Sequence, residues 1–461
     1  MKKPLIAALA IAAVALLAVP QILGRLTEKQ IRARAADLDG GAWSLEIKSY
    51  DRGWFRSHAV IEVGLSPGYA AGLPPSSSPG AAAGAPPGMP VAIDVAHGPV
   101  AVLDGAYLGW SKLVARADGT APQVAALEQQ LGVPQLFEFR SRTSLLGATS
   151  FDGAIPKLDV PLEVGSVRVS GGAFAGTVRG NRVQSEGHVD SIELSTPGAD
   201  MALRGLRAAI DLDIHSRAVL LGTTSVTLDN VSVTSALLGS ALFDASSVTL
   251  GSDVALDGSR TRLGIGTSYD IATMTVGGVQ LTNASIGLGL RDIDVDAFEA
   301  YRKATDEFLR TQDSGALQSA VMRVLAAHPT VALDPVRVLA DGEPFEARLE
   351  LTPNDRVSAD SLAFFDPAEL AGILNGNAEI NISRRLAERI AQQALRMQAG
   401  FDPSVRPEQL EEMLAAQSDA LLLMLASQGI VEANGTGFHA KVELADGELR
   451  LNGRPMPLGL Q

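Results

Sequence analysis

The feature that most constrains the fold is an alternation of apolar and polar residues that recurs between turn signals along most of the chain. It is clearest at residues 43–48, 345–351 and 378–382. A period of two sends successive side chains to opposite faces, which is typical of a strand with one buried face. Turn-favouring dipeptides such as Asp257-Gly258 separate many of these stretches. Because the connections are short, the strands are expected to pair as antiparallel meanders.

The body divides by pattern into two regions. Residues 41–294 are β-rich, with a flexible loop of Pro, Gly, Ala and Ser at residues 66–90 and with short strands expected from Val91 onward. Residues 295–461 mix helices with strands and end in a hairpin, and we expect them to continue the same body. Apolar spacing and start signals predict helices at residues 296–309, 317–325, 386–397 and from 407 to near 429.

The N-terminus begins with Lys2 and Lys3, followed by an apolar run at residues 4–24. Its length is that of a helix that spans a bilayer, although the same pattern fits a cleaved secretion signal. No pair of small residues stands where a cleavage site needs it, which favours an uncleaved membrane anchor at residues 1–24. Residues 25–40 are expected to form a helical stalk. Basic residues on both flanks leave the orientation open on charge alone.

Charge and cysteine content argue against several classes of function. The formal net charge of −14 argues against a nucleic-acid partner, which requires a basic surface. The chain contains no cysteine, which removes disulfides, thiolate metal sites and thiol nucleophiles. The six histidines lack metal-site spacing, and phosphate-loop, dinucleotide and nucleophile-elbow motifs are missing. We therefore predict no catalytic, cofactor-binding or metal-binding residue, and the sequence does not indicate an enzyme.

Three aspartates at alternate positions, Asp292, Asp294 and Asp296, invite a calcium-loop interpretation. However, the sixth loop position is Ala297 where such a loop has glycine, and the twelfth is Lys303 where it has glutamate. We expect these carboxylates instead to end a strand and to supply the acidic first turn of a helix.

Two clusters carry a resemblance to a known family. The first is Tyr50-Asp51-Arg52-Gly53-Trp54-Phe55-Arg56-Ser57, and the second is His97-Gly98-Pro99. Together with Asn452-Gly453-Arg454-Pro455 near the C-terminus, they resemble the YdgA-like family of bacterial envelope proteins, whose molecular function is unknown. The resemblance implies an inner-membrane anchor with the body in the periplasm. It implies no catalytic residues and no cofactor.

The first cluster has two interpretations. In the structural one, Gly53 permits a tight turn or a bulge that fixes a hairpin just outside the membrane. In the functional one, Trp54 and Phe55 anchor the chain at the lipid interface, with Arg52 and Arg56 near the headgroups. The structural interpretation is favoured because aromatic side chains are usually buried. The remaining candidates, assigned a structural or interfacial role, are Tyr50, Ser57, His97, Gly98 and Pro99.

These expectations combine into an α+β fold: an N-terminal transmembrane helix, then a large, curved, mostly antiparallel β-sheet body with C-terminal helices packed on it. A curved sheet with one apolar face can leave a groove for acyl chains. The leading hypothesis is a periplasmic protein, held in the inner membrane through residues 4–24, that binds a lipid or another hydrophobic ligand. The alternatives are an envelope scaffold that binds another protein and, third, a hydrolase of cell-wall material.

Overall fold

A computed structural model of the 461-residue chain shows a mostly antiparallel β-sheet architecture with a few helices, in which the sheet is not closed. The prediction of an α+β fold is confirmed at this level. The residues that the structure describes are 43–65, 88–98, 100–103, 105–162, 164–216, 218–235, 241–276, 278–311, 314–357, 372–399, 407–445 and 447–456, with Arg25, Glu28, Lys29 and Arg32.

The predicted anchor at residues 1–24, most of the predicted stalk and most of the loop at residues 66–90 lie outside the described residues. Within the part of the chain that is described, no helix combines the length and the apolar composition needed to cross a membrane. The chain divides into two units, which are described separately. Unit 1 comprises residues 1–220 and 302–316, and unit 2 comprises residues 221–301 and 317–461.

Unit 1 is an antiparallel meander in which each main strand pairs with the next. Its core is formed by inward-facing small and β-branched side chains such as Ala59, Ile61, Val95 and Ala115. A small separate hairpin, β4 (Val100–Val102) with β5 (Ala106–Leu108), interrupts the series. The main strands are β1 (Trp43–Arg52), β2 (Arg56–Leu65), β3 (Met89–His97), β6 (Ser111–Ala117), β7 (Glu138–Thr143), β8 (Thr149–Ile155), β11 (Gly172–Arg179), β12 (Arg182–Ser195) and β13 (Ala199–Ile214), with β10 (Gly165–Val169) beside β12 and β9 (Leu158–Leu162) beside β10.

One helix of unit 1, α3 (Pro122–Leu131), was not predicted from the sequence. Pro122 begins it in the favoured first-turn position, and Gly132 ends it in the left-handed conformation. Val124 is its one buried residue, so the segment lacks the apolar stripe on which sequence-based assignment depends.

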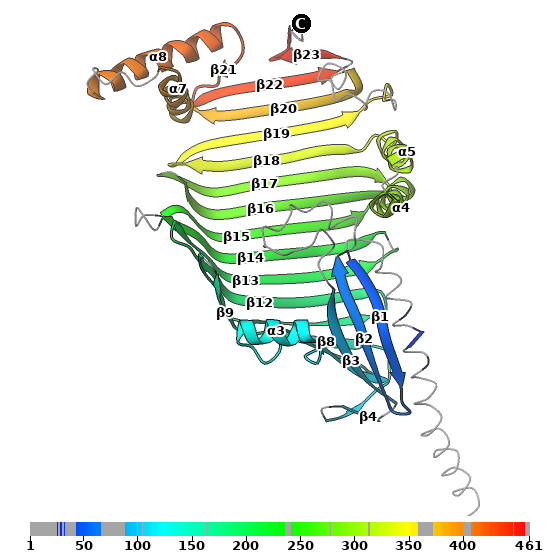
Figure 1. Cartoon of the computed structure of the whole chain (residues 1–461). Coiled ribbons are helices and arrows are strands. Elements are labelled where there is room, and N and C mark those ends of the chain that lie inside the picture. Colours follow the sequence, from blue (N-terminus) through cyan, green and yellow to red (C-terminus); the bar gives the residue numbers. More distant parts are fainter. Residues whose placement is uncertain are drawn as a thin grey trace, which may run out of the picture. The chain divides into compact units, whose positions relative to one another are not determined.

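Unit 2 consists mainly of long antiparallel strands that pair in chain order (Figure 1). The predicted hairpin at the end is confirmed, since Ala445 pairs with Glu448, and a second turn at Asn452-Gly453 follows it. The strands are β14 (Leu220–Ser235), β15 (Ala241–Leu256), β16 (Arg262–Val276), β17 (Val279–Asp294), β18 (Thr330–Ala340), β19 (Glu343–Pro353), β20 (Leu374–Ser383), β21 (Glu432–Ala433), β22 (Gly437–Ala445), β23 (Glu448–Leu451) and β24 (Arg454–Met456).

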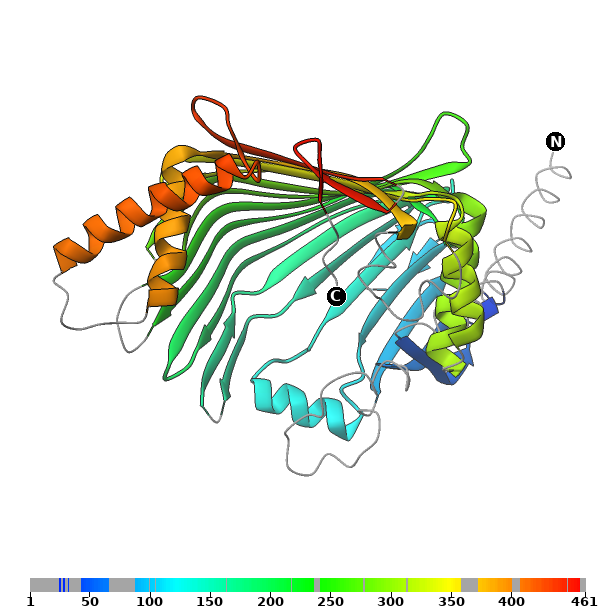
Figure 2. The ribbon, with the colours of Figure 1, turned by 90° about the horizontal axis from the view of Figure 1, so that it is seen from above.

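The prediction of short strands up to residue 294 was wrong for β12 to β17, which are 14 to 16 residues long. In β15 and β17 the apolar positions change phase near Ser247 and Asn283, and both residues have a positive φ (50° and 51°). A left-handed residue redirects the side chains that follow, so the period of two breaks although the strand continues. Figure 2 shows that the strands of unit 2 bend along their length.

The four helices predicted for the last third are confirmed: α4 (Val295–Thr311), α5 (Ser314–Leu325), α7 (Arg384–Ala399) and α8 (Pro407–Ser427). Figure 2 shows α7 and α8, in orange, at one end of the strands of unit 2 and α5 at the other. Ala387 of α7 and Leu422 of α8 pack with Phe438 of β22 in a buried cluster that also contacts Ile382. These helices therefore cover part of one face of the sheet of unit 2.

Candidate functional site

The structure brings the two family-like clusters of unit 1 together. Ser57 of β2 and His97 at the end of β3 share a hydrogen bond of 2.8 Å between Oγ and Nε2. Ser57 pairs with Val95 in the register of the two strands, and His97 lies two residues further along the same face. Tyr50 of β1 pairs with Ala59, two residues from Ser57, so its side chain lies on this face as well. We call Tyr50, Ser57 and His97 the buried motif cluster.

Burial dominates the electrostatics of this cluster. Ser57 is 4% exposed and His97 is 1% exposed. Removal from water lowers the pKa of His97 below its ordinary value, so the imidazole is neutral near pH 7. Burial also raises the pKa of Tyr50. The Nδ1 atom of His97 and the hydroxyl of Tyr50 are buried and have no hydrogen-bond partner among the described residues.

A serine hydroxyl bonded to a neutral imidazole is the arrangement of an activated nucleophile and its base. In working sites of that kind, a third group orients the imidazole and the hydroxyl is open to substrate. Here Nδ1 has no partner in the described part of the chain, and both side chains are enclosed. The chemistry that the geometry supports is a buried hydrogen bond that joins β2 to β3.

The turn between β1 and β2 holds the other residues of the first cluster. The amide of Gly53 donates to the carbonyl of Arg56 at 2.8 Å, and a Cβ at position 53 would lie 2.5 Å from that oxygen. Only glycine fits this close approach. Trp54 and Phe55 are 48% and 49% exposed at the tip of the turn. The burial that the structural interpretation expected is therefore not found at these two rings.

Arg52, the last residue of β1, contacts the described part of the predicted stalk. Its guanidinium lies 3.2 Å from the carboxylate of Glu28, which also pairs with Arg32 at 3.1 Å. The guanidinium of Arg32 lies 5.9 Å from the centre of the Tyr50 ring. Glu28 and Arg32, which follow the apolar run, thus contact the C-terminal end of β1.

The second cluster forms the end of β3. Gly98 has a φ of 113°, and its amide donates to the carbonyl of Trp110 at 3.1 Å. That backbone conformation favours glycine, which explains the residue type. Pro99 lies outside the described residues. Lys112, also buried, pairs with Ala96 and so lies on the opposite face of the sheet from His97, where its ammonium donates to the carbonyl of Leu103.

In unit 2 the pairing of β16 to β22 places apolar side chains on one face. Leu288 pairs with Leu333, which pairs with Leu349, and Leu349 pairs with Ala378. Directly paired residues share a face, so this row crosses β17, β18, β19 and β20. Five large side chains of this face, between 39% and 45% exposed, are Ile286, Leu288, Leu290, Val331 and Ile380. We call these five residues the apolar face of unit 2.

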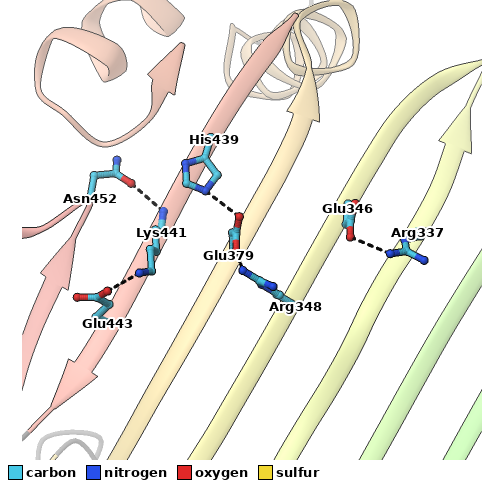
Figure 3. Close-up of polar contacts among 8 residues, drawn as sticks. All are labelled: Arg337, Glu346, Arg348, Glu379, His439, Lys441, Glu443 and Asn452. Carbon is cyan, nitrogen blue, oxygen red and sulfur yellow. Dashed lines mark hydrogen bonds and ion pairs between the residues drawn. The ribbon is translucent and has the colours of Figure 1, made fainter. Parts of the chain in front are cut away.

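The opposite face of the same strands is polar (Figure 3). Arg337 of β18 lies 3.3 Å from Glu346 of β19. Glu379 of β20 bonds to Arg348 of β19 and, at 3.1 Å, to His439 of β22. Burial alone raises the pKa of Glu379, but the hydrogen bonds from Arg348 and His439 outweigh it and hold the pKa below its ordinary value. Lys441 bonds to Glu443 at 2.6 Å, which likewise lowers the pKa of that carboxyl.

These carboxylates are paired with basic side chains, those of Glu346 and Glu379 on neighbouring strands and that of Glu443 within β22. Exposed ion pairs of this kind contribute at most about 1 kcal/mol each to stability. The described residues hold no group of three or more histidine, aspartate or glutamate side chains that could bind a metal ion. The polar face therefore has the character of a solvated surface. The unusual feature of unit 2 is its apolar face.

The aspartates near residue 294 are placed as expected. Asp294 ends β17, and its carboxylate accepts the amide of Ala297 at 2.9 Å in the first turn of α4. Asp296 is the acidic residue of that turn. This is the strand-ending and helix-starting role predicted in place of a calcium loop.

Comparison with known proteins gives one match. The family model described as bacterial protein of unknown function (DUF945) matches residues 1–459. The chain belongs to this family. The resemblance to a family of unknown function is thereby confirmed over nearly the whole chain. No curated protein and no solved structure matches this chain.

The sequence did not reveal which residues meet in space. Ser57 and His97 were both singled out, but their contact depends on the pairing of β2 with β3 across the intervening loop. The apolar face was signalled by the alternation of Ile286, Leu288 and Leu290 with glycines, although alternation does not tell whether a face is covered.

Proposed function

We propose that this protein is a membrane-anchored periplasmic protein that binds a lipid, or another ligand with acyl chains, on the apolar face of unit 2. The observation that carries the proposal is the exposure of that face. One-sided antiparallel sheets usually bury their apolar face against a second layer. Here the five side chains of the face keep 39% to 45% of their surface in water.

The energetics favour an apolar occupant. Burying a large aliphatic side chain completely stabilises by about 1.5–3 kcal/mol. Covering the exposed part of each of the five side chains therefore contributes roughly 1 kcal/mol, or about 5 kcal/mol for the face. Association costs reduce this gain, so a ligand that is already insoluble in water is favoured over a small polar one.

Acyl chains fit the dimensions of the face. Ala378 pairs in turn with Val442 of β22, so the row crosses five strands spaced about 4.8 Å apart, a width of roughly 19 Å. One leaflet of a bilayer is about 15 Å of hydrocarbon, half of a core about 30 Å thick. An acyl chain lying across the strands would thus contact most of them. The apolar run at residues 4–24 supports the proposed location, because it would hold the body beside its source of lipid.

The test is photo-crosslinking in living cells that produce the full-length chain. A photoactivatable phenylalanine analogue replaces Leu288 on the apolar face, and a control chain carries it at Arg337, an exposed residue of the polar face. Irradiation is expected to attach phospholipid at position 288 and not at position 337, as judged by mass spectrometry of the peptides.

Two outcomes would count against lipid binding. A protein adduct at position 288 without a lipid adduct would favour the scaffold alternative, in which the apolar face binds another envelope protein. Equal labelling at positions 288 and 337 would mean that the apolar face is not a binding surface.

A further inference from the structure

One end of unit 1 gathers exposed apolar side chains from three connections that are distant in sequence. The register aligns them: Arg56 pairs with Ala96, His97 pairs with Ser111, Ser111 with Thr143, and Thr143 with Thr149. The β1–β2 turn, the β4–β5 hairpin and the β7–β8 turn therefore emerge at the same end of the strands. The exposed side chains that we call the tip patch are Trp54, Phe55, Val102, Leu108, Trp110 and Leu146.

The backbone ties these connections to one another. The amide of His97 donates to the carbonyl of Phe55 at 2.8 Å, and the amide of Trp110 donates to the carbonyl of Thr143 at 2.8 Å. The indole of Trp110 donates to the carbonyl of Leu145 at 2.8 Å. The tip patch is consequently a fixed surface, although Leu146 at its edge is 96% exposed.

We propose that the tip patch inserts into the interfacial region of an anionic phospholipid bilayer, the membrane that holds residues 4–24. The composition fits this occupant, since tryptophan and phenylalanine prefer the level of the headgroups and aliphatic tips enter the hydrocarbon. Contiguous exposed apolar surface on a protein usually marks an interaction site.

The position of the N-terminal segment points to the same surface. Glu28 lies 3.2 Å from Arg52, which adjoins the Trp54 turn. Residue 24, where the apolar run ends, is four residues before Glu28, a reach of at most about 14 Å. A helix that leaves the bilayer at this point would bring the tip patch to the lipid surface.

Charge is complementary as well. Arg52, Arg56 and Arg142 stand exposed at this end of unit 1, in a chain whose net charge is −14. Asp51 and Glu28 offset part of this charge. Arginines beside a ring of aromatic side chains suit lipid phosphates. The inference rests on the proposed membrane anchor at residues 4–24, and it is independent of lipid binding by unit 2.

The absence of cysteine from the chain allows a direct test by spin labelling. Single cysteines at Val102 and Leu146 carry the label, and Leu162→Cys is the control because Leu162 is also exposed but lies in β9, which pairs with β10 at the opposite end of unit 1. The full-length chain is reconstituted in vesicles of phosphatidylcholine with or without phosphatidylglycerol. Collision rates with oxygen and with a water-soluble nickel chelate report the depth of each label.

Labels at positions 102 and 146 are expected to collide several-fold more with oxygen, relative to nickel, than the label at position 162. Phosphatidylglycerol should increase that difference, and Arg56→Gln should remove the increase. Water-like values at positions 102 and 146 in both kinds of vesicle would overturn the proposal. Because all three positions are exposed, the labels report depth without disturbing the core of unit 1.

Discussion

Ser57 and His97 lie 40 positions apart in the sequence and share a 2.8 Å hydrogen bond inside unit 1. This bond joins two motifs that the sequence presents separately. It is the one partner of the imidazole among the described residues, since Nδ1 has none there. The pair therefore links conformation at the β1–β2 turn to conformation at the end of β3.

Replacing Ser57 by alanine should lower the stability of the β2–β3 pair by about 1–3 kcal/mol, because it leaves both ring nitrogens of His97 buried without a partner. Hydrogen exchange followed by mass spectrometry would show faster exchange at residues 56–65 and 89–97. Ser150→Ala, at an exposed position of β8, is the matched control. Unchanged exchange in the Ser57 variant would mean that the bond between Ser57 and His97 contributes nothing to the stability of the β2–β3 pair.

Stability should also depend on pH through His97. Its pKa is lowered in the folded chain, so the unfolded chain takes up the proton first as the pH falls. The contribution to stability is complete above the ordinary pKa of about 6.5 and is lost as the pH falls toward the folded-state pKa. The difference in unfolding free energy between the native chain and His97→Gln should therefore shrink from pH 7.5 to pH 5.5. If this difference in unfolding free energy stays constant over the same pH range, folding does not lower the pKa of His97.

The carboxyl of Asp211 should titrate far below most aspartates. Hydrogen bonds from Arg182 at 2.8 and 2.6 Å, and from Gln184 at 3.1 Å, lower its pKa to about 2. The stabilisation from this pairing is present above the ordinary pKa near 3.8 and is lost as the pH falls through about 2. Carbon-13 NMR of labelled aspartate should show this, and Arg182→Gln should move the pKa back toward 3.8. An unchanged titration in the variant would remove Arg182 as the cause.

Asn452 should hold the C-terminal hairpin to the end of α8. Its side chain accepts the amide of Lys441 at 2.7 Å and donates to the carbonyls of Gly429 at 2.9 Å and Ile430 at 3.2 Å. Its φ of 50° is one that asparagine tolerates better than alanine. Asn452→Ala should lose about 1–3 kcal/mol of local stability, measured by hydrogen exchange at residues 437–456.

Asn452→Gly separates the two causes, because glycine keeps the turn but not the side-chain bonds. We expect its exchange to be intermediate between the native chain and the alanine variant. Native-like protection in Asn452→Gly would show that turn conformation alone matters.

Local signals in the sequence were sufficient for the helices and hairpins of unit 2. Pro407 marked the start of α8, and Asp446-Gly447 marked the turn after β22. The lengths of β15 and β17 were missed because Ser247 and Asn283 interrupt the alternation without ending the strand. α3 was not predicted because it buries one residue. A helix is recognised in a sequence by the stripe of apolar residues that it buries, and this segment lacks such a stripe.

The candidate residues of unit 1 could be named from the sequence, but their arrangement could not. The contact of Ser57 with His97 and the gathering of Trp54 with Leu146 at one end both depend on strand register. Register is a long-range property that the alternation of a single strand does not encode.

The central claim is that the apolar face of unit 2 holds acyl chains. The most direct measurement is the amount of phospholipid that purifies with the full-length chain, compared with Leu288→Asp and with the polar-face control Glu346→Gln. We expect at least one phospholipid per native and control chain, and a several-fold loss in Leu288→Asp without unfolding. Equal phospholipid in all three chains, or none in the native chain, would contradict it.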